Sequence, residues 1–291
     1  DKMGGFPRAG FNRKAPLRPA ISPQKAAEIL PGDRTSPYNM HALLETLADA
    51  GSLEEYKAEY GKTLICATAR IDGWAVGIVA NQREIVKAKK PGGGTELQMG
   101  GVIYSDSADK AARFIMNCNQ QRIPLVFLQD VTGFMVGSRS EQGGIIKDGA
   151  KMVNAMANSV VPKFTFIIGN SYGAGNYAMC GKAYDPRLIY AWPSAQMAVM
   201  SGASAGKTLL QIREAALKSK GVQLGEEEKA ALLSEIDRKY NEQLSPYYAA
   251  ARLWVDGIID PADTRKVISM GIEAADHAPI TERYNVGVIQ T

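Results

Sequence analysis

Hydrophobic and polar positions along the chain form short apolar runs and longer amphipathic stretches. Two apolar runs within 63–81 are separated by Asp72-Gly73, a dipeptide that favours the tight turn of a β-hairpin. Residues 107–122 carry apolar side chains at helical spacing, which predicts an amphipathic helix. The mainly apolar run 123–130 follows and predicts a buried strand.

The order of helix, strand and Gly-bounded turn then repeats. The pattern predicts a helix over 143–159, a strand over 161–169 and one or two strands over 183–200. Because strands alternate with helices, the fold class is predicted to be α/β with parallel strands. The other predicted elements are helices over 39–50, 204–220 and 225–245, two helices within 246–275, a helical turn or two over 53–60, and a loop over 87–101.

The first 37 residues differ from the rest in composition. The chain does not begin with Met, and this stretch is rich in Pro, Gly and Arg, which is typical of a linker. We therefore expect residues 1–37 to be a linker from a missing preceding domain and residues 38–291 to form the folded domain.

Composition narrows the class of protein. A hydrophobic fraction of 45% and a charged fraction of 22% are typical of a globular protein, and a net charge of +4 is too small to indicate nucleic-acid binding. No apolar run is long enough to span a bilayer. Three cysteines with unpaired spacing indicate reduced core thiols and a cytoplasmic protein, and two histidines do not support a metal site.

Two Gly-bounded turns, 131–137 and 172–176, are the candidate functional sites. Each follows an apolar strand and precedes a helix, where backbone N–H groups are free to bind an anion. Neither turn holds a Ser, Cys or His that could act as a nucleophile. The alternative interpretation is that the glycines only permit tight turns, and that the aromatic rings of Phe134 and Tyr172 fill the local core instead of walling a flat ligand.

The other motifs are weaker indications of function than the two turns. In SGASAGKT (201–208) only three residues separate the two glycines, so the spacing of a phosphate-binding P-loop fails. No G-x-S-x-G elbow is present, which argues against a serine hydrolase. Asp130 and Asp148 border the first turn and are candidates for acid–base work, although carboxylates at such positions are more often structural.

Three segments together carry a resemblance. LQDVTGFMVG (128–137), GGIIKDGAKMV (143–153) and the long run 167–195 resemble the biotin-dependent acyl-CoA carboxyltransferases. The chain looks like the C-terminal half of the carboxyltransferase subunit of methylcrotonyl-CoA and propionyl-CoA carboxylases, and the likeness extends to VDGIIDPADTRKVI (255–268). The resemblance implies a crotonase-like spiral of ββα units, with residues 1–37 leading from the N-terminal carboxyltransferase half.

The resemblance also implies a site and a reaction. In this family carboxybiotin is thought to release carbon dioxide, and its ureido oxyanion takes the α-proton of an acyl-CoA. Preorganised backbone N–H groups stabilise such oxyanions. Carried onto this chain, the biotin-side donors are Ala174 and Gly175. The residues implied to bind biotin are Gly133, Phe134, Val136, Gly137, Tyr172, Gly173 and Asn176.

The implied partners are an acyl-CoA substrate, a biotin carboxyl carrier protein, the N-terminal half and further copies of the subunit. Segments 87–101 and 225–243 look longer than in the methylcrotonyl-type subunits and more like the α subunit of glutaconyl-CoA decarboxylase, which transfers carboxyl from acyl-CoA to biotin in a membrane-associated complex. Two other readings stay open: a non-catalytic scaffold module, and an enoyl-CoA hydratase or isomerase with the same fold.

Overall fold

The computed structural model describes residues 7–33, 36–89, 93–218 and 225–289. Within these ranges the centre is an eight-stranded sheet in the order β1-β2-β3-β7-β9-β10-β12, with β11 pairing beside the end of β9. From β3 to β12 all neighbours are parallel, which confirms the predicted α/β class. The strands are β1 Glu54–Glu55, β2 Leu64–Ile71, β3 Trp74–Asn81, β7 Leu125–Val131, β9 Lys163–Tyr172, β10 Leu188–Ala191, β11 Gln196–Ala198 and β12 Gly257–Ile258.

The predicted hairpin at Asp72-Gly73 is confirmed. Ile71 at the end of β2 pairs with Trp74 at the start of β3, so the turn has two residues. Both have positive φ, 52° at Asp72 and 81° at Gly73, which is the geometry that Asp-Gly adopts at low cost.

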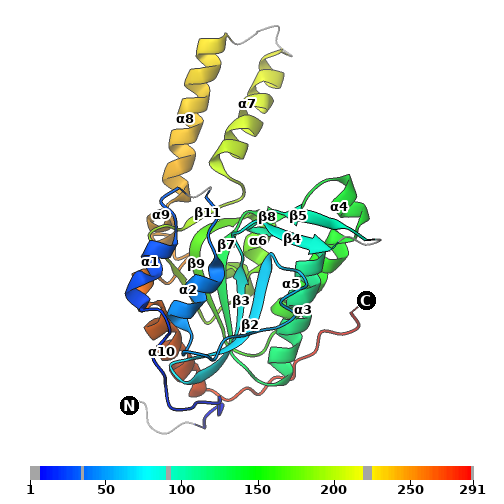
Figure 1. Cartoon of the computed structure of the whole chain (residues 1–291). Helices are drawn as coiled ribbons and strands as arrows, with labels where there is room; N and C mark the ends of the chain where they lie inside the picture. Colours follow the sequence, from blue (N-terminus) through cyan, green and yellow to red (C-terminus); the bar gives the residue numbers. More distant parts are fainter. Residues whose placement is uncertain (1–6, 34–35, 90–92, 219–224, 290–291) are drawn as a thin grey trace.

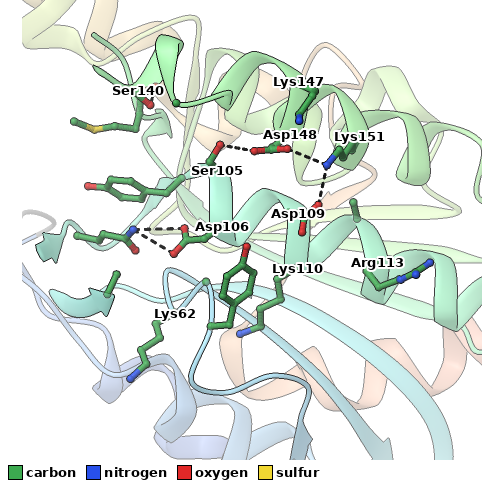
Figure 2. A pocket seen from close by; sticks show the side chains of 18 of the residues that line it. Lys62, Ser105, Asp106, Asp109, Lys110, Arg113, Ser140, Lys147, Asp148 and Lys151 are labelled. Atoms are coloured by element: carbon green, nitrogen blue, oxygen red, sulfur yellow. Dashed lines mark hydrogen bonds and ion pairs between the residues drawn. The ribbon is translucent and has the colours of Figure 1, made fainter. Parts of the chain in front are cut away.

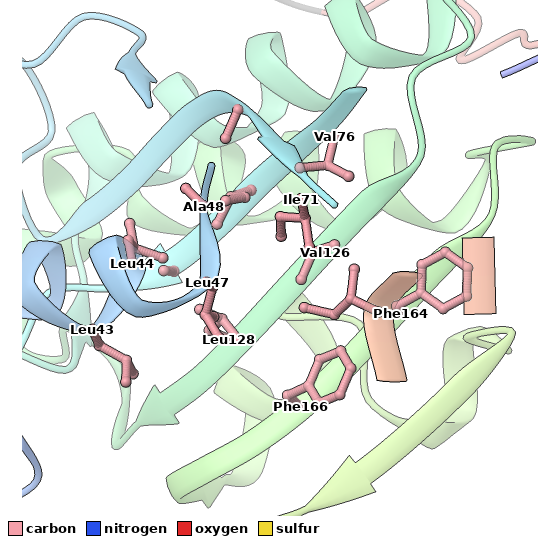
Figure 3. Packing of buried hydrophobic residues seen from close by; sticks show 14 of the residues in the cluster. Leu43, Leu44, Leu47, Ala48, Ile71, Val76, Val126, Leu128, Phe164 and Phe166 are labelled. Carbon is pink, nitrogen blue, oxygen red and sulfur yellow. The ribbon is translucent and has the colours of Figure 1, made fainter. Parts of the chain in front are cut away.

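Helices cover both faces of the sheet (Figure 1). On one face lie α3 (Ser105–Gln120) and α5 (Ile145–Ala157), and on the other lie α2 (Met40–Leu47) and α10 (Thr264–Asp276). Figure 3 shows the second layer, where leucines of α2 pack on strand residues such as Val126 and Leu128. Because both faces are covered, the strand residues are apolar in succession rather than in alternation.

Two sequence-based predictions were wrong. Residues 53–60 form β1 and turns instead of a helix, because the backbone of Glu54 and Glu55 pairs with β2. In the predicted loop 87–101, of which residues 90–92 lie outside the described ranges, β4 (Val86–Lys89) pairs antiparallel with β5 (Thr95–Gln98). The two strands were not predicted because their composition is polar, and it is polar because only one face of the hairpin is buried.

The remaining helices complete the frame. Helices α7 (Gly202–Lys218) and α8 (Glu226–Leu244) form a pair that projects from the body (Figure 1). No helix of the described residues is both long enough and apolar enough to cross a membrane. The short elements are η1 Pro23–Lys25, α1 Ala26–Ile29, β6 Val102–Ile103, β8 Gly133–Phe134, α4 Ser138–Gln142, α6 Gly173–Ala178, η2 Lys182–Tyr184, α9 Pro246–Ala250 and η3 Pro261–Asp263.

The described part of the expected linker, 7–33 and 36–37, contacts the domain. Gly10 and Phe11 donate their backbone N–H groups to the Asp276 carboxylate at 2.8 and 2.9 Å, and Ala26 is fully buried. Arg13 lies over the ring of Trp74, 4.6 Å from its centroid. This segment therefore covers one end of the sheet.

All three cysteines are buried and free, as predicted for core thiols. Burial raises the pKa of Cys66 and Cys118 to about 12 and that of Cys180 to about 11. Since only the thiolate is nucleophilic, we expect the native protein at pH 8 to react with a thiol reagent many times more slowly than the protein in denaturant. Colorimetric thiol titration checks this, and rapid labelling of any cysteine in the native state would contradict it.

Candidate functional site

The first turn begins where β7 ends. After Val131 the chain enters β8, whose Gly133 and Phe134 pair with β6, and the N–H of Met135 donates to the carbonyl of Ile103 at 2.8 Å. At Gly137 a φ of 109° starts α4, a conformation that L side chains rarely adopt. The turn is therefore held by the backbone.

The side chains of this turn have two different surroundings. The ring of Phe134 is half-buried against α5: a Cβ added to Gly149 would lie 2.9 Å from its Cε1 atom. The side chain of Val136 is 75% exposed. Phe134 therefore packs on the local core, and Val136 with Gly137 is open to a ligand or partner.

The second turn is shorter than the sequence indicates. Strand β9 continues through Tyr172, and α6 begins directly at Gly173, whose φ is +51°. A Cβ on Gly173 would lie 2.8 Å from the carbonyl oxygen of Val199, so a side chain has no room there. The buried hydroxyl of Tyr172 lies 3.1 Å from the Asn170 amide oxygen and 2.7 Å from that of Gln196, which fixes the ring within the protein.

The two turns meet at Gly175. This residue is buried, and a Cβ added to it would lie 2.6 Å from Cγ2 of Val131 and 3.2 Å from Cα of Gly133. The glycine therefore permits close contact between α6 and β8. Residues more than 40 positions apart in the chain are brought together by the parallel pairing of β7 with β9.

Backbone donors lie in the first turn of α6. The N–H groups of the first turn of a helix have no acceptor within that helix. For Ala174 and Gly175, no bond to an acceptor outside helices and strands is found among the described residues either. Ala174 is exposed, so its N–H belongs to a residue that a ligand can approach. The arrangement suits an oxyanion and supplies no side-chain nucleophile.

The Asp130 carboxylate makes hydrogen bonds and an ion pair within the protein. It accepts hydrogen bonds from the Tyr38 hydroxyl at 2.9 Å and the Asn170 N–H at 2.8 Å, and its Oδ2 lies 3.3 Å from Nε of Arg83. Burial and the neighbouring Asp130 charge raise the pKa of Tyr38 well above its usual value, so this hydroxyl stays protonated and donates. These contacts favour a structural role.

Asp148 belongs to a second polar cluster (Figure 2). It accepts a hydrogen bond from the Ser105 hydroxyl at 2.5 Å and pairs with Lys151 at 3.1 Å, and Lys151 also pairs with Asp109 at 3.1 Å. Burial lowers the pKa of Lys151, but its bonds to the two carboxylates outweigh this and raise it. Lys151 is therefore a stable cation within this cluster.

We predict that neither carboxylate is the base that removes a substrate proton. Asp130→Asn and Asp148→Asn should each slow exchange of the α-proton of an acyl-CoA, in an enzyme completed with its other half, by less than about tenfold. A general base typically contributes about 10²–10⁴-fold, so a loss of several hundredfold with the fold unchanged would make that residue the base. Asp130→Asn should also lower the melting temperature, because it removes a buried ion pair.

A large pocket adjoins the first turn. Its volume is about 1310 Å³, and it lies between the β4–β5 hairpin, α3, α5 and the turn after β8 (Figure 2). Val136 and Gly137 line it together with the Asp148–Lys151 cluster, whereas the residues of the second turn do not. The site residues predicted from sequence thus fall into two groups, one lining the pocket and one at the contact of α6 with β8.

The polar residues beneath α6 were not predicted from the sequence. Gln129 and Ser171 are buried, and Ser171 donates its hydroxyl hydrogen to Oε1 of Gln129 at 2.6 Å. Asn176, predicted to bind biotin, donates its amide to the Ser171 hydroxyl at 2.8 Å. A signal was present, because a glutamine within the apolar run 123–130 is unusual in a buried strand.

Comparison with known proteins identifies the family. Residues 3–286 match the family model for the carboxyl transferase domain. The chain is 42% identical over 282 residues to the biotin-dependent 3-methylcrotonyl-coenzyme A carboxylase beta1 subunit of Mycobacterium tuberculosis, covering 97% of this chain and 50% of that protein. The chain thus spans about half the length of such curated relatives.

Solved structures show the same relation. The beta subunit of P. aeruginosa geranyl-CoA carboxylase is 34% identical, with a TM-score of 0.79 over 97% of this chain and 50% of its own. A transcarboxylase 12S structure, described as a hexamer with hydrolysed methylmalonyl-coenzyme A bound, has a TM-score of 0.79 and 34% identity over 98% of this chain and 50% of its own.

Proposed function

Because this chain belongs to the carboxyl transferase domain family, we propose that it is the biotin-facing half of a biotin-dependent acyl-CoA carboxyltransferase. The predicted crotonase-like α/β fold is confirmed by the match to solved carboxyltransferases. The observation that carries the proposed site is the contact between the two turns at buried Gly175, which places the N–H groups of Ala174 and Gly175 in the first turn of α6, with Ala174 exposed.

The residues present fit a biotin ring. Ala174 is exposed and adds only a methyl group, so a ring could approach its N–H, while Gly173 and Gly175 let the backbone of α6 pack closely on Val199 and Val131. When bound, carboxybiotin would supply the carboxyl group and a basic ureido oxygen. The protein's part is to hold that oxygen with N–H donors, to orient the ring with the turn 133–137, and to exclude water. Each such donor typically lowers the barrier by about 2.7–4 kcal/mol.

The same residues would serve carboxylation and decarboxylation, because a donor that stabilises an oxyanion does so in both directions. A relative of methylcrotonyl type at 42% identity favours carboxylation over the glutaconyl-CoA decarboxylase alternative. An enoyl-CoA hydratase is disfavoured, because Asp130 and Asp148 are engaged in other contacts. A non-catalytic scaffold module would not need a turn without large side chains at 173–175. A cytoplasmic location stays a prediction.

Completion of the enzyme tests the proposal. We expect the purified chain alone to turn over no acyl-CoA, because the thioester oxyanion hole belongs to the N-terminal half of the subunit. Adding that half and a biotin carrier should restore carboxybiotin-dependent exchange with at least one ester in a panel of acyl-CoA compounds. Turnover by the chain alone, or no exchange after completion, would contradict this function.

We also predict that the chain self-associates or binds the N-terminal half. Family active sites would form where the two halves of different subunits meet, and this chain exposes apolar side chains outside the pocket. They include Leu209, Ile212, Leu253 and Trp254 on α7 and after α9. Sedimentation velocity at micromolar concentration, with the N-terminal half present, should show an oligomer. A persistent monomer would contradict the prediction.

A further inference from the structure

A chain of hydrogen bonds runs beneath α6 and reaches both of its ends. Asn176 donates to the Ser171 hydroxyl, and Ser171 donates to Oε1 of Gln129 at 2.6 Å. At its other end, Nε2 of Gln129 donates to the carbonyl of Met179 at 2.7 Å. One buried amide on β7 thus contacts Ser171, two residues before α6, and Met179, the residue that follows it.

The sheet is locally modified to make this contact possible. Gln129 pairs with Ile167 and Val131 pairs with Ser171, so the register of β7 with β9 shifts between the two pairs. Irregularities of this kind re-aim side chains and are common beside active sites. Gln129 and Val131 therefore both face α6, one through hydrogen bonds and the other by packing on Gly175.

We propose that Gln129 is a positioning residue, whose clamped amide sets the position of α6 and so aims the N–H groups of Ala174 and Gly175. The inference rests on the proposed function, since it assumes that these N–H groups are the oxyanion donors. A six-residue helix has few hydrogen bonds of its own, and its first residue is a glycine with positive φ. Its orientation therefore depends on contacts from outside the helix.

The expected effect follows from the geometry of donors. A misplacement of about 1 Å can cost roughly 10²-fold in rate, while substrate binding elsewhere is unaffected. Gln129→Leu removes both bonds of the amide and leaves the Ser171 hydroxyl and the Met179 carbonyl buried without that partner. We expect a loss of about 10–100-fold in kcat with little change in KM for the acyl-CoA.

The experiment uses the complete carboxyltransferase subunit that contains this chain. Carboxyl transfer is measured from the carboxylated acyl-CoA ester that the intact enzyme decarboxylates fastest, with free biotin as the acceptor of the carboxyl group and the acyl-CoA as the other product. Thr63→Val is the matched control, because the Thr63 hydroxyl makes a buried hydrogen bond of 2.9 Å to Ser107 outside both turns. We expect Gln129→Leu and Thr63→Val to lower the melting temperature similarly, and only Gln129→Leu to lower kcat.

Two further variants test the positioning role even if Gln129→Leu does not fold. Ser171→Ala removes the link between Asn176 and Gln129 but leaves the bond to Met179, so it should lower kcat by several-fold even if Gln129→Leu does not fold. Gln129→Glu keeps an acceptor for Ser171 but loses the N–H that donates to the Met179 carbonyl, so it should lower kcat more than Ser171→Ala does. Loss of kcat that follows melting temperature across all variants, control included, would overturn the positioning role.

Failure of the inference is distinguishable from failure of the proposed function. If Gly175→Val keeps near-normal transfer in the same assay, α6 does not hold the oxyanion and both ideas fail. If Gly175→Val is inactive while Gln129→Leu and Ser171→Ala keep the kcat of the Thr63→Val control, the site stands and only the positioning role is wrong.

Discussion

Replacing Gly175 by valine is expected to reduce carboxyl transfer in the completed enzyme by about 10²–10³-fold or more. A Cβ at this position would lie 2.6 Å from Val131 Cγ2 and 3.2 Å from the Gly133 Cα atom. A branched side chain must push α6 away from β8, which moves the proposed donors and separates the two turns of the proposed biotin site. Steady-state transfer to free biotin measures the loss.

Stability has to be measured beside activity. Overpacking a buried position typically costs about 1–3 kcal/mol, which a domain of this size can absorb while staying folded. Gly32→Val is a suitable control, because a Cβ added to Gly32 meets no atom within 4 Å. Near-normal transfer by a folded Gly175→Val variant would mean that biotin binds elsewhere.

The second large effect is expected from Ala174→Pro, which deletes one backbone donor. Ala174 is the second residue of α6, and proline is tolerated in the first turn of a helix, where its missing N–H has no helical partner. Gly173 precedes it and has the conformational freedom that a residue before proline needs. We expect kcat to fall by about 10²–10³-fold with little change in KM.

A matched variant separates the donor from the side chain. Ala174→Ser also changes the exposed side chain but keeps the N–H, so it should retain transfer within about tenfold of the parent protein. Equal losses in Ala174→Ser and Ala174→Pro would show that the side chain at this position matters and the N–H does not. Circular dichroism of both variants should confirm that the fold is unchanged.

Long segments of regular pattern were predictable. The helix over 107–122 is found as Ser105–Gln120, and the strand over 123–130 as Leu125–Val131. Both follow from residue periodicity, which is a local property of the chain. The two errors of element type, at 53–60 and 87–101, concern strands that depend on a partner: β1 needs β2, and β4 needs β5.

The candidate site was predictable only in its separate parts. The motif 128–137 and the run 167–195 indicate the family, and the bare turn at 173–175 indicates work done by the backbone. Polar residues whose hydrogen-bond partners lie far away in the chain gave no such signal. Asp130 looks like a free carboxylate in sequence, and its partners Tyr38 and Asn170 lie 92 and 40 positions away.

The sequence by itself therefore determined the α/β class, the hairpin at 72–73 and the glycines that strip the second turn. These depend on apolar periodicity and on the backbone freedom of single residues. Only the tertiary structure decided that Gly175 packs on Gly133, that Gln129 bonds Ser171 and Met179 on either side of α6, and that the turn after β8 opens into a large pocket. Each of these is a contact between segments far apart in the chain. Such contacts are set by strand register and close packing, and no local pattern of residues encodes them.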